Sequence, residues 1–399
     1  MTIDKIPAKI VEYWQDFRKE EVPMEKKRID WVDGLKGIAC ILIFCHHFAL
    51  IFFPATFYGK WVSTRFYGID TRLAQSPLGV VLNGNFLLAV FCMLSAFILS
   101  LQVMKMEDKT RLGAVVAKRY FRLMPPLFGI GLVVWAFLRF GLFTNAGVVA
   151  STGSPWAGVY YQGTMSFRQF LEAALVKVWF YGDESLSTAF WMLSRLFYGS
   201  FLSVLLSSVA WKYRKRAWIL YVFVAMLLFD QSELLLAFAL GTLLAWLVVQ
   251  EFRLPKLLAP MAVLAGLVLG GYPSGISAEN FYRYFRGLTF IDWHILGAFV
   301  LLLGILSWKG VQKLLSWRLF GWLGKISYSV YLIHIPLLFS LSTGIFLWAE
   351  KWLGYLGSVA LSFGVSLAVL VTLSWLYHRL VETGCGKLQD RLFARLEKK

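Results

Sequence analysis

The sequence has few charged residues, and acidic residues are the scarcer kind. Only 16% of its 399 residues are charged, and 23 acidic side chains stand against 40 basic ones. A soluble globular domain carries about a quarter charged residues. The shortage of charge therefore excludes an ordinary soluble protein.

Cysteine is also rare. Cys40, Cys45, Cys92 and Cys385 show no Cys-x-x-Cys spacing, and three of them lie within apolar stretches. We interpret them as packing residues, and we expect neither a disulfide framework nor a metal site. The first thirty residues contain no apolar core, so we expect no cleavable signal peptide.

Hydrophobic residues make up 58% of the chain and gather in long runs such as Leu234–Val249, Leu257–Tyr272 and Leu356–Leu376. A helix needs about 20 apolar residues to cross the core of a bilayer. The runs predict an all-α, polytopic membrane protein of about ten transmembrane helices. We place these helices near 34–54, 79–101, 123–143, 189–210, 217–230, 233–250, 258–272, 288–306, 322–343 and 356–377.

The net charge of +17 could indicate a nucleic-acid partner, but the placement of the charges argues against one. Lys and Arg gather in the N-terminal segment and in alternate loops on its side of the predicted membrane. Because such loops stay in the cytoplasm, both termini are predicted to be cytoplasmic, with membrane lipids as partners and no nucleic acid. The expected parts are a cytoplasmic segment 1–32, a transmembrane domain 33–378 and a basic cytoplasmic tail 379–399. In the long loop 144–188, Phe167–Phe180 could form an interfacial helix.

The first predicted helix carries a lysine and two histidines, Lys36, His46 and His47. Eleven residues of helix turn by about 20° net and rise by about 16 Å, so Lys36 and His47 share one face. A neutral imidazole buried at that depth could be a general base. The alternative is a histidine pair that only hydrogen-bonds to neighbouring helices.

Arg119 and Arg122 precede the third predicted helix and are followed by Pro125 and Pro126. On a helix, residues three apart lie on one face, and paired guanidinium groups bind phosphates bidentately. A donor that bears a nucleotide, such as coenzyme A, would suit them. An anchor that contacts lipid headgroups is the simpler interpretation of this pattern.

Ser327, Tyr331 and His334 form a polar stripe on the ninth predicted helix, at spacings of four and three residues. Such a stripe faces the protein interior or a wet cavity. The spacing does not decide between helix packing and a substrate site.

Taken in order along the chain, these segments resemble the acyltransferase 3 family of membrane acyltransferases. The matching segments are Lys36 with His47, Phe91–Phe97, Arg119 with Arg122 and Pro125, Phe238–Gly241, Leu323–His334 and Tyr377–Glu382. They cover nearly the whole predicted membrane region. No single motif is decisive, but the ordered set is specific.

One segment departs from the family pattern. The family usually shows Trp-x-Leu-x-x-Glu at the start of the fourth helix, whereas this chain begins the segment with Trp191 and has Leu196 at the glutamate position. The departure leaves open an altered acceptor site, a replacement carboxylate such as Glu184, or a weakened enzyme.

The resemblance implies transfer of an acyl group, with acetyl expected, from acetyl-CoA or another acyl-CoA to a hydroxyl of a carbohydrate or lipid-linked glycan. Acyl-CoA would be a substrate, and no bound cofactor is expected. His47 would be the general base or acyl relay, Arg119 and Arg122 would hold the donor's phosphates, and Lys36 would add positive charge where the donor enters. The substrate cavity would include Ser95, Trp191, Ser327, Tyr331 and His334.

A transporter or flippase of a glycan or lipid-linked intermediate is the alternative function, because interior polar residues and basic loops suit it equally well. We predict an integral membrane location, in the cytoplasmic membrane of a bacterium. The sequence leaves open a eukaryotic internal membrane.

Overall fold

The computed structural model describes residues 29–106, 112–229, 233–273, 281–285 and 287–396, and every regular element in these ranges is a helix. Most of the predicted cytoplasmic segment 1–32 therefore lies outside the described residues. The long helices are α2 (Asp30–Phe52), α5 (Gly84–Lys105), α6 (Leu112–Phe140), α10 (Trp191–Tyr213), α14 (Phe290–Ser307), α16 (Arg318–Leu337) and α17 (Thr343–Tyr377). The shorter ones include α11 (Ala217–Leu228), α12 (Glu233–Val249), α13 (Leu258–Gly270), α15 (Lys309–Leu315) and α18 (Thr383–Leu396).

Among the described residues, six helices are long and apolar enough to cross a membrane, and α11, α12 and α13 are shorter apolar helices. The last of the six runs from Arg318 to Phe393 and is broken at Gly354, whose φ of 63° and ψ of −178° are not helical. The predicted ranges 322–343 and 356–377 lie on the two sides of this break. The all-helical membrane fold is thus confirmed, while the number of ten crossings and the side on which the termini lie stay predictions.

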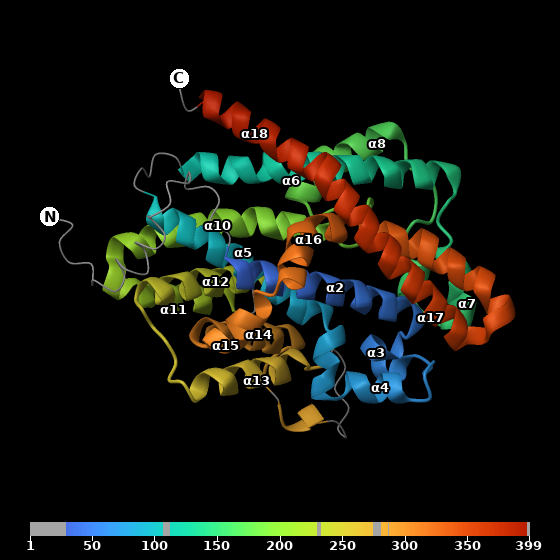
Figure 1. Ribbon diagram of the computed structural model, residues 1–399, viewed down its shortest axis with the longest axis horizontal. Helices are drawn as coiled ribbons and strands as arrows, with labels where there is room; N and C mark the ends of the chain where they lie inside the picture. The colour runs from blue at the N-terminus through green and yellow to red at the C-terminus, as the bar shows by residue number, and fades with distance from the viewer. Residues whose placement is uncertain (1–28, 107–111, 230–232, 274–280, 286, 397–399) are drawn as a thin grey trace.

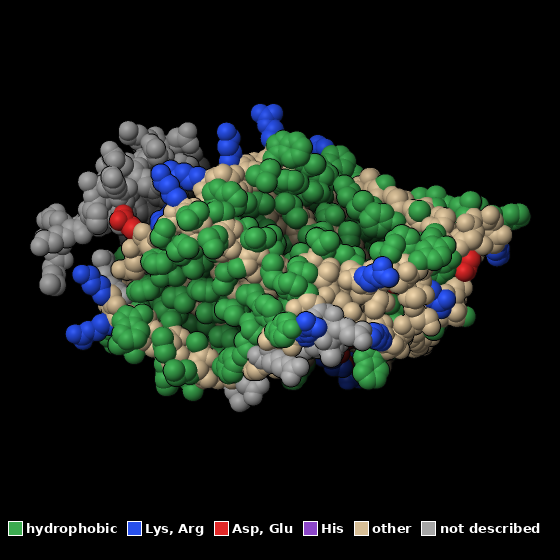
Figure 2. Space-filling view, turned by 90° about the horizontal axis from the view of Figure 1, so that it is seen from below, with side chains coloured by type: hydrophobic (Ala, Val, Ile, Leu, Met, Phe, Trp, Pro, Cys, Tyr) green, Lys and Arg blue, Asp and Glu red, His purple; other side chains and the backbone are tan. Residues whose placement is uncertain are grey.

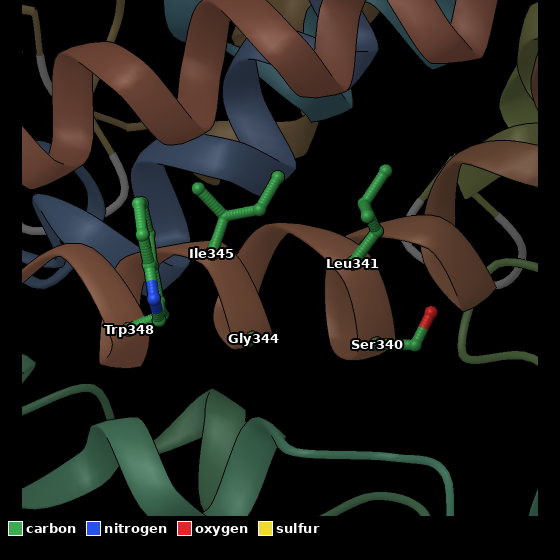
Figure 3. Close-up of a pocket in the computed structure, with 5 residues that line it drawn as sticks. All are labelled: Ser340, Leu341, Gly344, Ile345 and Trp348. Atoms are coloured by element: carbon green, nitrogen blue, oxygen red, sulfur yellow. The ribbon is translucent and has the colours of Figure 1, made fainter.

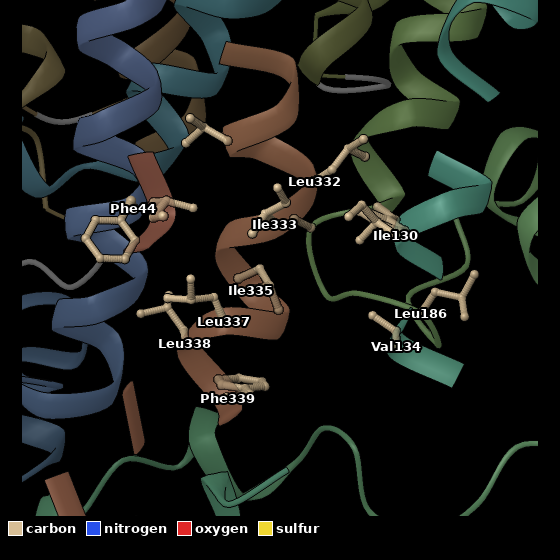
Figure 4. Close-up of a cluster of buried hydrophobic side chains, with 14 of the residues drawn as sticks. Phe44, Ile130, Val134, Leu186, Leu332, Ile333, Ile335, Leu337, Leu338 and Phe339 are labelled. Carbon is tan, nitrogen blue, oxygen red and sulfur yellow. The ribbon is translucent and has the colours of Figure 1, made fainter. Parts of the chain in front are cut away.

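Helix α2 lies at the centre of the molecule, between two hydrophobic cores (Figure 1). One core joins α2 to α6, α16 and α17, and the other joins it to α5, α12 and α14. Figure 4 shows part of the first core, where Leu332 and Leu337 of α16 lie between Phe44 of α2 and Ile130 of α6. Because it borders both cores, α2 is held in place over its whole length.

The outer surface is largely apolar. Figure 2 shows hydrophobic side chains over a broad part of one face, with most Lys and Arg side chains around its margins. Large side chains such as Leu205, Met226 and Leu264 are more than half exposed. Exposed apolar surface of this extent suits contact with lipid tails, which carry no hydrogen-bonding groups.

The structure extends the third predicted helix towards the N-terminus. Helix α6 begins at Leu112 instead of near residue 123, so Arg119 and Arg122 lie inside a helix and not in front of one. Pro125 and Pro126 also lie inside it. The prediction followed the apolar run, but Ala, Lys, Arg and Leu are good helix formers and continue the helix beyond it.

Two other predicted segments are helical. The stretch 167–180 forms a continuous run of α8 (Phe167–Glu172), a π-helical turn and α9 (Val178–Phe180), which confirms the helix in the long loop. The predicted tail 379–399 contains α18, which continues from α17 through a π-helical turn and packs against α6.

Candidate active site

Helices α2 and α16 run parallel and meet in one constant register. The Sγ atom of Cys40 donates to the carbonyl oxygen of Ser327 at 3.1 Å, and the rings of His47 and His334 meet at 3.2 Å; both pairs are 287 positions apart. Parallel helices in register keep residues of equal offset side by side over several turns. The histidine of the first predicted motif is therefore paired with the histidine of the polar stripe.

The two paired histidines are closely constrained. Nε2 of His334 lies 3.2 Å from Nδ1 of His47, and their ring centroids are 5.0 Å apart. Nδ1 of His47 also lies 3.0 Å from the carbonyl oxygen of Ile43, and Nδ1 of His334 lies 2.8 Å from that of Tyr331. His334 is buried, while His47 is half-buried. The pair combines a fixed geometry with one ring that remains partly accessible.

His46 points to a different neighbour. Its Nδ1 donates to the carbonyl oxygen of Leu82 at 2.7 Å, and its ring packs against the backbone at Gly84, where a Cβ would lie 2.5 Å from the ring. His46 thus ties α2 to the start of α5, and its role is that of a helix-packing histidine.

The long loop 141–190 reaches over His47 and contributes residues for which the sequence showed little signal. The ring of Trp156 stacks on His47, with centroids 5.3 Å apart and an interplanar angle of 23°. Tyr160 lies 6.2 Å from Trp156, and its hydroxyl donates to Oε2 of Glu184 at 2.9 Å. Glu184 alone was named from the sequence, because Trp156 and Tyr160 belong to no recognisable motif.

The phenol of Tyr160 stays protonated at ordinary pH. Burial, together with its hydrogen bond to Glu184 and the negative charge of that carboxylate, raises the pKa of Tyr160 to about 12. The hydroxyl is therefore a donor to Glu184 over the physiological range. This places an ordered carboxylate two side chains away from His47.

Ser95 and Arg119 form a second pair. The guanidinium of Arg119 donates a hydrogen bond to the hydroxyl of Ser95, from α6 to α5. Arg119 is half-buried, while Arg122 is exposed. The structure thus joins two of the predicted residues, Ser95 and Arg119. Arg122 faces outward, as a group that meets a soluble or headgroup phosphate must.

The other predicted residues are placed as follows. Lys36 is half-buried on α2, eleven residues and about three helical turns before His47. The hydroxyl of Ser327 donates to the carbonyl of Gly324 within its own helix at 2.9 Å, and that of Tyr331 donates to the carbonyl of Ala189. Trp191 packs beside the second core. The contact of Tyr331 joins α16 to the segment in front of α10, whereas that of Ser327 stays within α16.

Leu196, at the family's glutamate position, is half-buried and packs against both hydrophobic cores. The leucine thus suits its site as a packing residue.

Two cavities lie away from these residues. A surface depression of about 300 Å³ is lined by Ser340, Leu341, Gly344, Ile345 and Trp348, in the π-helical turn before α17 and in the first turns of that helix (Figure 3). A small cavity of about 20 Å³, near the size of one water, lies beside Asn83 and His294. Neither is lined by a residue that the sequence predicted for the site.

The fold and the histidine pair together define an integral membrane protein with a polar centre inside its helix bundle. Residues 29–371 match the model of the acyltransferase 3 family, which is described as an acyltransferase domain, and the chain belongs to this family. The match covers the histidine pair, Ser95, Arg119 and the loop residues around Trp156. The resemblance drawn from the sequence is confirmed.

Two curated fungal proteins are similar over a shorter stretch. Acyltransferase R4 of Phoma sp. is 32% identical over 107 residues, and acyltransferase clz18 of Cochliobolus lunatus is 30% identical over 108 residues. Each similarity covers 25% of this chain and 23% of the relative, so the chain spans about a quarter of the length of these relatives. No solved structure matches the chain.

Proposed function

We propose that this protein is a membrane O-acyltransferase that moves an acyl group, acetyl in the first instance, from acyl-CoA to a hydroxyl of a carbohydrate or lipid-linked glycan. The observation that carries the proposal is the contact between His47 and His334 at 3.2 Å, inside a chain that belongs to the acyltransferase 3 family. Imidazole is the side chain best suited to general base catalysis near neutral pH.

In the proposed reaction, His47 removes the proton from the acceptor hydroxyl. The oxygen attacks the thioester carbonyl, a carbon–oxygen bond forms, and the carbon–sulfur bond breaks. The leaving thiolate of coenzyme A takes up the proton that His47 received. Charges and atoms balance without a metal ion or a further cofactor.

The donor would bind at the arginine pair. Arg119 is oriented by its hydrogen bond to Ser95, and Arg122 presents its guanidinium to the outside. A guanidinium forms bidentate hydrogen bonds to phosphate, so two of them on adjacent turns suit the phosphates of coenzyme A. Lys36, nearer the N-terminal end of α2 than His47, would add positive charge along the donor's path.

The acceptor would approach from the side of the long loop. Trp156 stacks on His47 there, Tyr160 lies beside Trp156, and Glu184 accepts a hydrogen bond from Tyr160, so the loop offers an aromatic surface with a carboxylate at its far end. A carbohydrate presents both apolar ring faces and hydroxyl groups, which match such a surface. Glu184 is therefore our choice for the carboxylate that replaces the family's glutamate.

The predicted bacterial cytoplasmic membrane stays a prediction. The two curated relatives are fungal and are named acyltransferases. Their similarity to this chain covers only about a quarter of their length. A eukaryotic internal membrane is equally compatible with the helices that the structure contains.

The function is tested by mass spectrometry of glycans and lipids from cells that contain the protein, that lack it, or that carry His47→Ala at equal level. We expect a mass difference of one acetyl group that wild type restores and His47→Ala does not. His46→Asn is the matched control: it lies on the same turn, and its amide can keep the hydrogen bond to Leu82. We expect it to retain transfer.

Two outcomes would contradict the proposal. Equal acylation by wild type and His47→Ala would remove His47 from the reaction. An unchanged acylation pattern, with glycan accumulating on one side of the membrane when the protein is absent, would indicate a transporter.

A further inference from the structure

Two backbone carbonyls determine which nitrogen carries the proton in each paired histidine. Nδ1 of His334 lies 2.8 Å from the carbonyl oxygen of Tyr331, and Nδ1 of His47 lies 3.0 Å from that of Ile43. A carbonyl oxygen only accepts hydrogen bonds, so each Nδ1 must be the donor. In a neutral imidazole the other nitrogen, Nε2, then keeps its lone pair.

The contact between the two rings agrees with this assignment. Nδ1 of His47 has one proton, which it shares between the carbonyl of Ile43 and Nε2 of His334 at 3.2 Å. Nε2 of His334 has the lone pair to receive it. The His334 ring cannot turn away easily, because it is 1% exposed and its own Nδ1 is held by Tyr331.

The remaining nitrogen of the pair is Nε2 of His47. No group in the described residues hydrogen-bonds to it, and its ring is the half-buried one. We propose that His334 is a positioning residue that orients the His47 ring and leaves Nε2 of His47 as the base of the reaction. This inference deepens the proposed acyl-transfer function and rests on it.

The arrangement also stabilises the charged form of the base. When Nε2 of His47 takes the proton of the acceptor hydroxyl, the ring becomes an imidazolium and its Nδ1–H becomes a stronger donor. That donor already faces the lone pair on His334, so the hydrogen bond strengthens as the charge develops. A third group that orients the base in this way is a recurrent element of nucleophilic sites.

The test compares two substitutions of His334. One can keep the contact with His47, and the other can keep only the contact with the carbonyl of Tyr331. In His334→Gln, the side-chain oxygen can reach the place of Nε2 and accept from His47. In His334→Asn, the shorter amide can occupy the place of Nδ1 and donate to Tyr331, but it does not reach His47. Both variants remove the imidazole and leave a buried polar group of similar kind, so a difference between them reports the contact with His47.

We expect His334→Asn to lower kcat by about 10- to 100-fold, the range caused by loss of an orienting partner at metal-bound histidines. The KM for acetyl-CoA should stay unchanged, and His334→Gln should retain most of the activity. The assay follows release of the CoA thiol from acetyl-CoA, with a lipid extract of the producing cells as acceptor. Wild-type kcat in His334→Asn, or equal losses in both variants, would overturn the inference.

A second measurement does not depend on activity. The chain has five histidines, so ¹⁵N spectra of the histidine-labelled wild-type protein are simple, and the His47 signals are those absent from His47→Ala. We expect a protonated Nδ1 and an unprotonated Nε2 on His47. A proton on Nε2 overturns the inference whatever the activity, whereas the correct tautomer without any acetyl-CoA consumption would overturn the proposed function alone.

Discussion

Gly37 of α2 and Gly324 of α16 are in direct backbone contact. A Cβ on Gly37 would lie 2.6 Å from the backbone nitrogen of Gly324, and a Cβ on Gly324 would lie 2.0 Å from the carbonyl oxygen of Asp33. Small residues let two membrane helices approach closely, since no side chain separates the backbones. The same register carries on, ten residues later, to the contact between His47 and His334.

Gly324→Leu should therefore damage both stability and the histidine pair. The larger side chain has to push α16 away from α2, at a cost of about 1–3 kcal/mol or more, as for overpacking of a tight core. The measurement is thermal unfolding of the purified protein in detergent, together with acyl transfer. Gly321→Leu is the control on the same helix, because a Cβ at Gly321 meets no atom within 4 Å. Equal melting temperatures for the two variants would contradict the close contact.

Ser95→Ala should weaken donor binding without abolishing the reaction. The substitution removes the acceptor that orients the guanidinium of Arg119. A hydrogen bond to a charged group contributes about 1.5–3 kcal/mol at most, so we expect the KM for acetyl-CoA to rise by about tenfold. Steady-state kinetics measure it. Arg139→Ala, an exposed arginine at the other end of α6, is the control and should leave KM unchanged. A change in kcat alone would argue against donor binding at Arg119.

Tyr160→Phe should change how stability depends on alkaline pH. The pKa of Tyr160 is raised from 10.0 to about 12 by burial and by Glu184, so folding favours the protonated phenol. Its stabilising contribution is fully present below pH 10 and is lost as the pH rises towards 12. We expect wild type to have the higher melting temperature at pH 8, and the difference from Tyr160→Phe to shrink between pH 10 and 12. A difference in melting temperature that stays constant across this range would show that folding does not change the pKa of Tyr160.

Leu196→Glu should lower stability and bring no gain in acyl transfer, although it restores the family's glutamate. Leu196 is half-buried and packs against both hydrophobic cores, so a carboxylate there would lie against apolar side chains. Burying a polar group without a hydrogen bond costs about 1–3 kcal/mol in proteins. Leu196→Met keeps the volume and is the control. Higher activity in Leu196→Glu would show instead that the acceptor site still has a place for this carboxylate.

The sequence alone was sufficient for the class of fold and for the family. Long apolar runs can satisfy their backbone hydrogen bonds in a membrane only as helices or closed barrels, so the runs and the scarcity of charge predict a helical bundle. Each of the ten predicted ranges overlaps a helix of the structure. His47 and His334 stand out in the sequence because ionisable residues inside apolar helices are costly. Arg119 is marked by its spacing from Arg122, and Ser95 by the family resemblance alone.

Only the tertiary structure decided which of these residues meet. His47 and His334 are 287 positions apart. The predicted first and ninth crossings would run in the same direction, but nothing in either motif predicts that α2 and α16 are neighbours or in which register they meet. Trp156 and Tyr160 lie in a long loop with only short helical turns, where no periodicity marks a residue as close to the site. Local composition determines helices, because their hydrogen bonds are made within a few residues. Contacts between distant helices depend on side-chain packing, such as the glycine contact that brings the two histidines together.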